Sequence, residues 1–217
     1  TWNDNEIPDY TDVANLTEEQ QVAIYRLTAL GVIDGMNGWG GAYAGDTYFT
    51  REQLAKIAVY LSGNEDAVDL YASFGSAFGD IAEGRWSEGY INLCYELGLM
   101  KGVSTTAMIF APTSTVTYQE FATVVLRALG YDDNLPGVWP ADYSNKAVKM
   151  GLTKYTDYVG PQAINRADMA VMADNALDED MVTYVGNNSL SGVISATNDN
   201  YVDPDGYTYR ALYTNED

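Results

Sequence analysis

Apolar residues recur at helical spacing in three stretches of the chain, and each stretch runs into a glycine. The three sets are Ile24, Leu27 and Leu30 before Gly31; Ile91, Cys94 and Leu97 before Gly98; and Tyr143, Ala147 and Met150 before Gly151. Steps of three or four residues place side chains on one face of a helix. Glycine reaches the left-handed conformation that commonly ends a helix without a steric penalty. The pattern therefore predicts three helices that end at these glycines.

A second helix is predicted after each of them, beyond a loop rich in Gly, Thr and Tyr. The starts read TREQLA from Thr50, TYQEFA from Thr117 and NRADMA from Asn165, and they align without a gap. Thr or Asn followed three residues later by Gln, Glu or Asp resembles a capping box, which satisfies N–H groups of the first helical turn. The unit of helix, loop and capped helix thus occurs three times. Because one pair cannot bury both helices, the copies are expected to pack on one another around a shared axis.

The last part of the chain, 183–217, has a different pattern. Its apolar and aromatic residues are Leu190, Val193, Ile194, Tyr201, Tyr207, Tyr209, Leu212 and Tyr213, and they are interrupted by Asp203-Pro204-Asp205-Gly206. Such a pattern predicts short strands around a tight turn. The segment is either the start of a β-rich domain or an arm that pairs with something else. Asp199, Asp203 and Asp205 lack the spacing of a calcium loop, so a turn is expected and no metal.

Composition excludes several classes of function. The 217 residues include 11 Lys and Arg against 31 Asp and Glu, a net charge of −20, while 47% are hydrophobic. The apolar content suffices for a packed core. Nucleic acid is excluded as a partner because its phosphates require clustered cations. With no His and one Cys, the chain lacks the residues for Ser–His or Cys–His catalysis and for common zinc sites.

Two further features concern the cellular location. Cys94 lies in an apolar helical stretch, where it is expected to be a small core residue. No apolar run approaches the length of a membrane span, so membrane insertion is not expected. The chain begins at Thr1, as a processed or truncated product would, and we expect a secreted protein whose signal has been removed.

Several short motifs together resemble the S-layer homology repeat. They are Tyr10-Thr11-Asp12-Val13 and Phe78-Gly79-Asp80-Ile81 before a first helix, the Leu-Gly-x-x-x-Gly exit, an aromatic residue before the second helix (Phe49, Phe110), and Thr50-Arg51-Glu52-Gln53. The resemblance covers three copies, at 8–66, 72–131 and 133–180. It implies a mainly α protein, a pseudo-threefold spindle around a central three-helix bundle, followed here by the short β-rich segment.

The resemblance also implies a function, because the grooves between such repeats hold a bacterial cell-wall polysaccharide, often one with a pyruvylated sugar. Three departures bear on this expectation. Tyr118 stands where the family motif has Arg, Asn165 stands where it has Thr, and the third copy lacks a clean aromatic-x-Asp opening. Not every groove is therefore expected to bind.

Arg51 and Arg166 are the leading candidates for ligand contact. A cation at the first position of a helix opposes the helix dipole, so something is expected to compensate. Free N–H groups at a helix start and a guanidinium together suit a carboxylate. The alternative is that each arginine pairs with one of the many acidic side chains.

Six other residues complete the predicted site. Trp86 and Trp139 lie at helix starts, where each either stacks on a sugar ring or plugs the packing. Lys101 either adds a cation to a groove or is solvated. The remaining candidates are Asp12 and Asp80, which either bind sugar hydroxyls or tie turns, and Trp39 in the stretch Gly38-Trp39-Gly40-Gly41, which contacts sugar or folds back on the core.

The sequence thus predicts a non-enzymatic module without cofactors or metals that anchors a secreted protein in the cell wall or S-layer by binding wall polysaccharide. The first alternative is a structural subunit whose tyrosine-rich tail pairs with other copies of itself in a surface array. A glycosidase is the second alternative, since it requires two carboxylates across a cleft. No motif selects two of the chain's carboxylates for that task.

Overall fold

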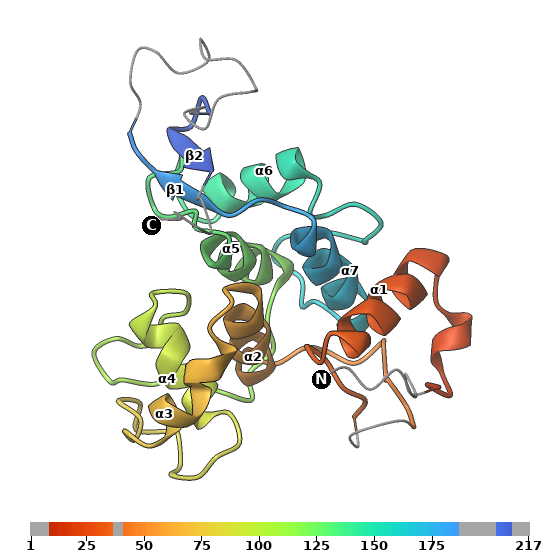
Figure 1. Ribbon diagram of the computed structural model, residues 1–217, viewed down its shortest axis with the longest axis horizontal. Coiled ribbons are helices and arrows are strands. Elements are labelled where there is room, and N and C mark those ends of the chain that lie inside the picture. The colour runs from red at the N-terminus through yellow and green to blue at the C-terminus, as the bar shows by residue number, and fades with distance from the viewer. Residues whose placement is uncertain (1–8, 37–40, 187–202, 210–217) are drawn as a thin grey trace, which may run out of the picture.

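The computed structural model describes residues 9–36, 41–186 and 203–209, and this part of the chain is mainly helical (Figure 1). The helices are α1 (Glu18–Ala29), α2 (Arg51–Leu61), α3 (Val68–Ala72), α4 (Glu88–Glu96), α5 (Tyr118–Ala128), α6 (Ala141–Met150) and α7 (Arg166–Leu177), and the strands are β1 (Val182–Tyr184) and β2 (Tyr207–Tyr209). The predicted combination of a mainly α protein with a short β part near its C-terminal end is confirmed. None of the described helices is both long and apolar enough to cross a bilayer.

The six predicted helices are present at the expected places. α1, α4 and α6 run into Gly31, Gly98 and Gly151, whose φ angles are +71°, +70° and +88°. The other three, α2, α5 and α7, begin directly after Thr50, Thr117 and Asn165. The sequence analysis missed α3, because a helix of five residues offers no apolar period to detect.

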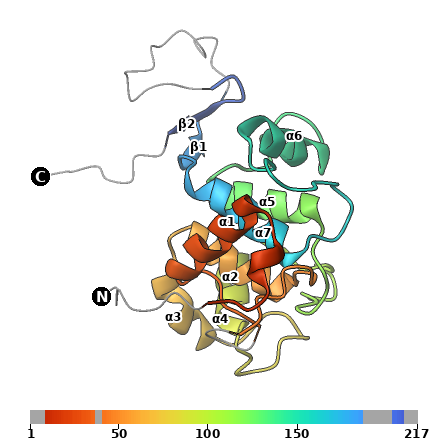
Figure 2. The same ribbon diagram turned by 90° about the vertical axis from the view of Figure 1, so that its right-hand side faces the viewer.

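The three capped helices form the centre of the protein. α2, α5 and α7 contact one another pairwise, and Figures 1 and 2 show them surrounded by the remaining helices. Their inward side chains, among them Leu54, Phe121 and Met169, are at most 1% exposed. Cys94 of α4 is fully buried against this centre, as predicted, and burial raises the pKa of its thiol well above the usual value.

Each outer helix packs on the capped helix of another repeat. α1 packs on α7, α4 on α2, and α6 on α5. The first helix of every repeat thus covers the capped helix of the repeat before it, with the first following the third. Consequently the three sequence repeats are not separate packing units, and each depends on its neighbours for a core.

Backbone hydrogen bonds connect the repeats in the same cyclic order. At the start of α2, the N–H groups of Arg51 and Glu52 donate to the carbonyls of Ser114 and Pro112; the first two N–H groups of α5 donate to Gln162 and Gly160, and those of α7 to Thr47 and Gly45. The expectation of free N–H groups at these helix starts is therefore wrong. They are occupied because a loop of a neighbouring repeat passes over each start.

The C-terminal strands pack on the chain's own helical part. β1 and β2 pair antiparallel, and the predicted turn is present, since Asp203 Oδ1 accepts from the N–H groups of Asp205 and Tyr207. Tyr207 is buried, with its ring centroid 4.7 Å from that of Tyr131. The partner of β2 is β1, which lies at the N-terminal end of the segment. The predicted strand residues Leu190, Val193, Ile194, Tyr201, Leu212 and Tyr213 lie outside the described residues.

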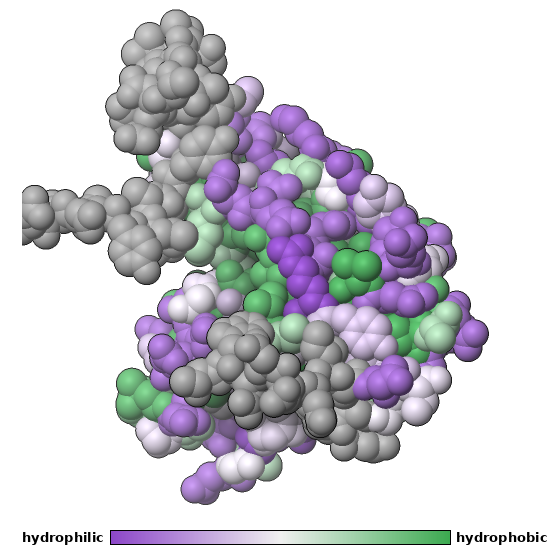
Figure 3. All heavy atoms as spheres, turned by 45° about the vertical axis from the view of Figure 1, so that its right-hand side comes forward, coloured by the Kyte–Doolittle hydropathy of each residue, from purple (hydrophilic) through white to green (hydrophobic). Residues whose placement is uncertain are grey.

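One face of the molecule can be described by its hydropathy. On the face that Figure 3 shows, they cover most of the described atoms, and hydrophobic side chains form separate patches between them. Across residues 9–36, 41–186 and 203–209, no three His, Cys, Asp or Glu side chains are placed to hold a metal ion. Asp203 and Asp205 instead bind Lys146 Nζ, each at 3.0 Å, whereas Asp199 lies outside the described part.

Candidate functional site

Two pockets with a common plan lie between the repeats. The Arg51 pocket has a volume of about 550 Å³ and the Arg166 pocket one of about 400 Å³. Each is built from the arginine that starts a capped helix, the loop after an outer helix, one face of the next capped helix, and a tryptophan. The shared positions are Arg51, Leu99–Lys101, Thr123 and Trp139 in the first, and Arg166, Val32–Asp34, Lys56 and Trp86 in the second.

Arg51 and Arg166 have nearly the same surroundings. Arg51 Nε donates to the carbonyl of Phe110 at 2.8 Å and Nη2 to that of Lys101 at 2.8 Å. Arg166 makes the matching bonds to the carbonyls of Tyr43 and Asp34, at 3.0 and 2.7 Å. Both residues are buried, since only 8% of Arg51 and 5% of Arg166 is exposed. Both arginines therefore hold the loops of a neighbouring repeat, and among the described residues neither forms the ion pair that the alternative expected.

An aromatic ring lies beside each guanidinium. The guanidinium carbon lies 4.8 Å from the ring centroid of Phe110 for Arg51, and 4.6 Å from that of Tyr43 for Arg166. Burial lowers the pKa of Arg51 from its usual value. Within the described residues, Nη1 of each arginine makes no hydrogen bond, so one edge of the guanidinium, rather than a free fork, is left without a partner there.

Asp12 and Asp80 hold the same loops from the other side. The Asp12 carboxylate accepts from the N–H groups of Tyr43 and Ala44 at 2.8 and 2.7 Å. Asp80 does the same for Phe110 and Ala111, at 2.9 and 2.7 Å. Neither aspartate lines the Arg51 or the Arg166 pocket. Their observed contacts match the turn-tying alternative, and contact of either aspartate with a sugar hydroxyl stays a prediction.

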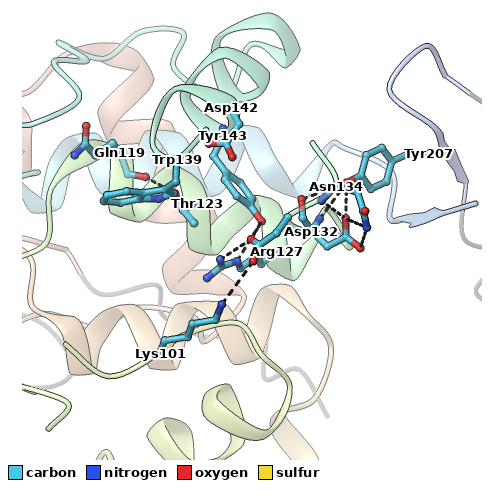
Figure 4. Close-up of polar contacts among 11 residues, drawn as sticks. Lys101, Gln119, Thr123, Arg127, Asp132, Asn134, Trp139, Asp142, Tyr143 and Tyr207 are labelled. Carbon is cyan, nitrogen blue, oxygen red and sulfur yellow. Dashed lines mark hydrogen bonds and ion pairs between the residues drawn. The ribbon is translucent and has the colours of Figure 1, made fainter. Parts of the chain in front are cut away.

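The tryptophans are open to solvent. Trp86 is 54% and Trp139 is 50% exposed, which is far more than a packing plug would be. Trp139 Nε1 donates to Thr123 Oγ1 at 3.1 Å, which fixes the ring over the pocket (Figure 4). Lys101, whose side chain is 59% exposed, lines the same pocket. Contact of these three with a sugar stays a prediction, and Trp39 lies outside the described residues.

The sequence analysis missed a cluster at one side of the Arg51 pocket. Figure 4 shows Lys101, Arg127 and Tyr143 pointing toward one another. Asp133 accepts from Arg127 Nη2 and from the Tyr143 hydroxyl, both at 2.9 Å, and lies 3.6 Å from Lys101 Nζ. Hydrogen bonds from Arg127 and Tyr143 lower the pKa of the Asp133 carboxyl. Alignment of the repeats gives no signal for Arg127, because Tyr60 and Asn175 stand at the matching positions.

Comparison with known proteins identifies part of the chain. Residues 77–122, from just before α4 into α5, match the family model of the S-layer homology domain. The chain carries an S-layer homology domain. The matched segment includes Asp80, Trp86 and Lys101, and it lies within the second predicted repeat.

Three relatives are similar to this chain over a longer stretch than the matched domain. A cell surface protein of Thermoanaerobacter kivui is 35% identical over 170 residues, which are 78% of this chain and 21% of the relative. The middle cell wall protein of Brevibacillus brevis is 30% identical over 175 residues, 81% of this chain and 16% of the relative. A surface layer protein of Brevibacillus choshinensis is 30% identical over 169 residues, which are 78% of this chain and 15% of the relative. The chain thus spans about a fifth or less of the length of these relatives. The domain match and the names of the relatives place it in the cell wall or S-layer.

A third pocket of this chain has different chemistry. Tyr118, in the place of Arg51, donates its hydroxyl to Asp168, and burial raises the pKa of this phenol. The acidic pocket beyond it has a volume of about 400 Å³. Its lining contains no Lys or Arg and consists of Glu18, Glu19, Val22, Ala23, Tyr155, Val171, Asp174 and Asn175. Glu19 stands where the other two pockets have tryptophan.

Proposed function

We propose that this chain anchors the protein that contains it to the bacterial cell wall by binding a secondary wall polysaccharide, non-covalently and without catalysis. The observation that carries the proposal is the repeated pocket. Two open pockets of the same plan each combine a half-exposed tryptophan with local cations, on a chain whose net charge is −20. The S-layer homology match and the names of the three relatives agree with such a role.

The proposal includes a pseudo-threefold arrangement of three repeats. It is supported by the pairwise contacts of α2, α5 and α7 and by the cyclic order in which outer helices cover them. The backbone bonds from each capped helix start to a neighbouring loop follow the same order. This arrangement explains why equivalent pockets recur between neighbouring repeats.

Binding in each competent pocket combines stacking with charge. The exposed face of Trp86 or Trp139 suits the apolar face of a sugar ring. Cations beside it, Lys56 in one pocket and Lys101 with Arg127 in the other, attract an anionic substituent such as a pyruvate ketal. Attraction is local because charges separated by more than about 8 Å are largely screened at physiological salt. The lining of the acidic pocket contains the exposed Tyr155 but no tryptophan, Lys or Arg. We therefore expect the Arg51 and Arg166 pockets to bind the polymer and the acidic pocket not to.

Co-sedimentation with purified cell walls tests this proposal. Wild-type chain is expected to sediment with intact walls and to stay in solution after the secondary polymer has been extracted. Trp86→Ala and Trp139→Ala each weaken binding, and the double variant abolishes it. Tyr48→Ala serves as the control, because Tyr48 is 62% exposed and lines neither pocket.

Three results would contradict the proposal. Undiminished binding to extracted walls would show that another wall component is the ligand. Concentration-dependent assembly of the chain without any wall material, together with full wall binding by the double variant, would favour the structural alternative. Release of sugar from the polymer would favour the glycosidase.

A further inference from the structure

The carboxylate of Asp133 lies on a complete set of anion-binding groups. Its Oδ1 accepts from Arg127 Nη2 and from the Tyr143 hydroxyl, and its Oδ2 lies 3.6 Å from Lys101 Nζ. The three donors come from α5, from α6 and from the loop after α4. Two cations and a hydroxyl that converge on both oxygens of one carboxylate are the groups that recognise a ligand carboxylate.

Two of the three donors, Arg127 and Tyr143, are held by packing, whereas the carboxylate is exposed. The Arg127 side chain is 16% exposed and its guanidinium lies 5.3 Å from the ring centroid of Tyr143, which itself is buried. Asp133 belongs to the short loop after α5, and its side chain is 66% exposed. An ion pair this exposed is easily separated, since such pairs contribute little to stability. Rotation of Asp133 into solvent therefore leaves the donor set in place.

The ion pairs of Asp133 with Arg127 and Lys101 lie where two cavities meet. Lys101, Arg127 and Asp133 line the Arg51 pocket, and they equally line a neighbouring cavity of about 370 Å³ that extends along Leu97–Leu99 and Gly130–Asp132. The Asp133 side chain thus belongs to the boundary that the two cavities share.

From these contacts we infer that Asp133 occupies, in the free protein, the subsite that receives a carboxylate of the ligand, and that the ligand displaces it on binding. This inference rests on the proposed function for the identity of the polymer, but not for the existence of the carboxylate subsite. Asp133 thereby lowers the affinity of the Arg51 pocket for anionic sugars. The Arg166 pocket has only the single pair of Lys56 with Asp34 at 3.1 Å, and Tyr60 stands in place of Arg127.

Acetate is the first probe, because it carries a carboxylate and nothing of the polymer. The full chain is titrated with acetate while the NMR signal of Arg127 Nε–H is followed, for the wild type and for Asp133→Asn. We expect the variant to bind acetate about two- to five-fold more tightly, the gain from removing an exposed competing ion pair. Asp46→Asn is the matched control, since it removes the same charge from an exposed residue that makes no ion pair among the described residues. Equal or weaker acetate binding by Asp133→Asn, or no response of Arg127, would overturn the inference.

The second probe is the 4,6-pyruvate ketal of methyl glucoside, with its methyl ester as the uncharged twin. Calorimetry is expected to show the same gain for the acid in Asp133→Asn and no gain for the ester. A gain with acetate but no binding to walls by any form of the protein would refute the proposed function and leave the subsite standing. Wall binding that is unchanged in Asp133→Asn, with no gain for acetate, would refute the subsite and leave the function standing.

Discussion

Replacement of Arg51 by alanine is expected to lower the free energy of unfolding, and this effect does not depend on any ligand. Its guanidinium donates to the carbonyls of Phe110 and Lys101, 59 and 50 residues away along the chain. A hydrogen bond from a charged donor contributes about 1.5–3 kcal/mol. Two such bonds set an upper range of about 3–6 kcal/mol, and water that enters the vacated space recovers part of it. We therefore expect a loss of about 3–4 kcal/mol in the free energy of unfolding.

This loss is large relative to the total. Domains of this kind are stable by about 5–15 kcal/mol, and each kcal/mol corresponds to about 2–4 °C in Tm at this size. The melting temperature is thus expected to fall by about 6–16 °C. Urea unfolding followed by circular dichroism at a helical wavelength measures the free energy, and a thermal melt gives the second value.

Two matched variants make the result decisive. Arg166→Ala is expected to lose a similar amount, because Arg166 makes the same pair of bonds to Tyr43 and Asp34. Arg26→Ala is expected to lose less, about 1 kcal/mol, since its side chain is 41% exposed. Its partners are the exposed Asp178 and, at 3.4 Å, Asp174. If Arg51→Ala loses no more than Arg26→Ala, the assigned structural role is wrong. Wall binding by arginine variants is interpretable only alongside these measurements.

Three further changes test other parts of the structure. Lys146→Met leaves two carboxylates without their shared partner, and because Lys146 is only 8% exposed we expect a loss of about 2–4 kcal/mol in urea unfolding; an unchanged midpoint would contradict this. Asp174→Asn is expected to stabilise the protein at pH 7, because burial raises the pKa of Asp174, so its charged form is disfavoured by folding. The advantage shrinks as the pH falls through the raised pKa, and melts at pH 7 and pH 4 check it. Gly102→Ala is expected to cost about 1–3 kcal/mol, since its new Cβ would lie 2.6 Å from the Ile109 carbonyl oxygen, whereas Gly79→Ala meets nothing within 4 Å and serves as the control.

Much of the candidate site was predictable, and the part that was not has a common cause. Trp86, Trp139, Lys101, Arg51 and Arg166 all line the two pockets, because the repeat alignment places equivalent residues at equivalent points of the fold. The partners of the arginines were not predictable. They are backbone carbonyls, which every residue carries, so no residue type marks them.

Asp12 and Arg127 show that a sequence motif does not decide which side chains line a pocket. Asp12 stands in a motif, yet its carboxylate binds the backbone of Tyr43 and Ala44 instead of facing a pocket. Arg127 stands in no motif, yet it lies beside Lys101 and Tyr143 at the Arg51 pocket. Which way a surface side chain points depends on the loops packed beside it, and those loops come from another repeat.

By itself the sequence determined six of the seven described α-helices, the ends of those six, the turn at 203–206 and the family. These features depend on interactions within about one helical turn: apolar period, capping side chains and glycine at positive φ. Only the tertiary structure decided that each outer helix covers another repeat's capped helix, that the helix-start N–H groups are occupied, and that Asp133 lies on Arg127. Such contacts join residues brought together by packing, whose energies are summed over the whole core and leave no local pattern in the chain.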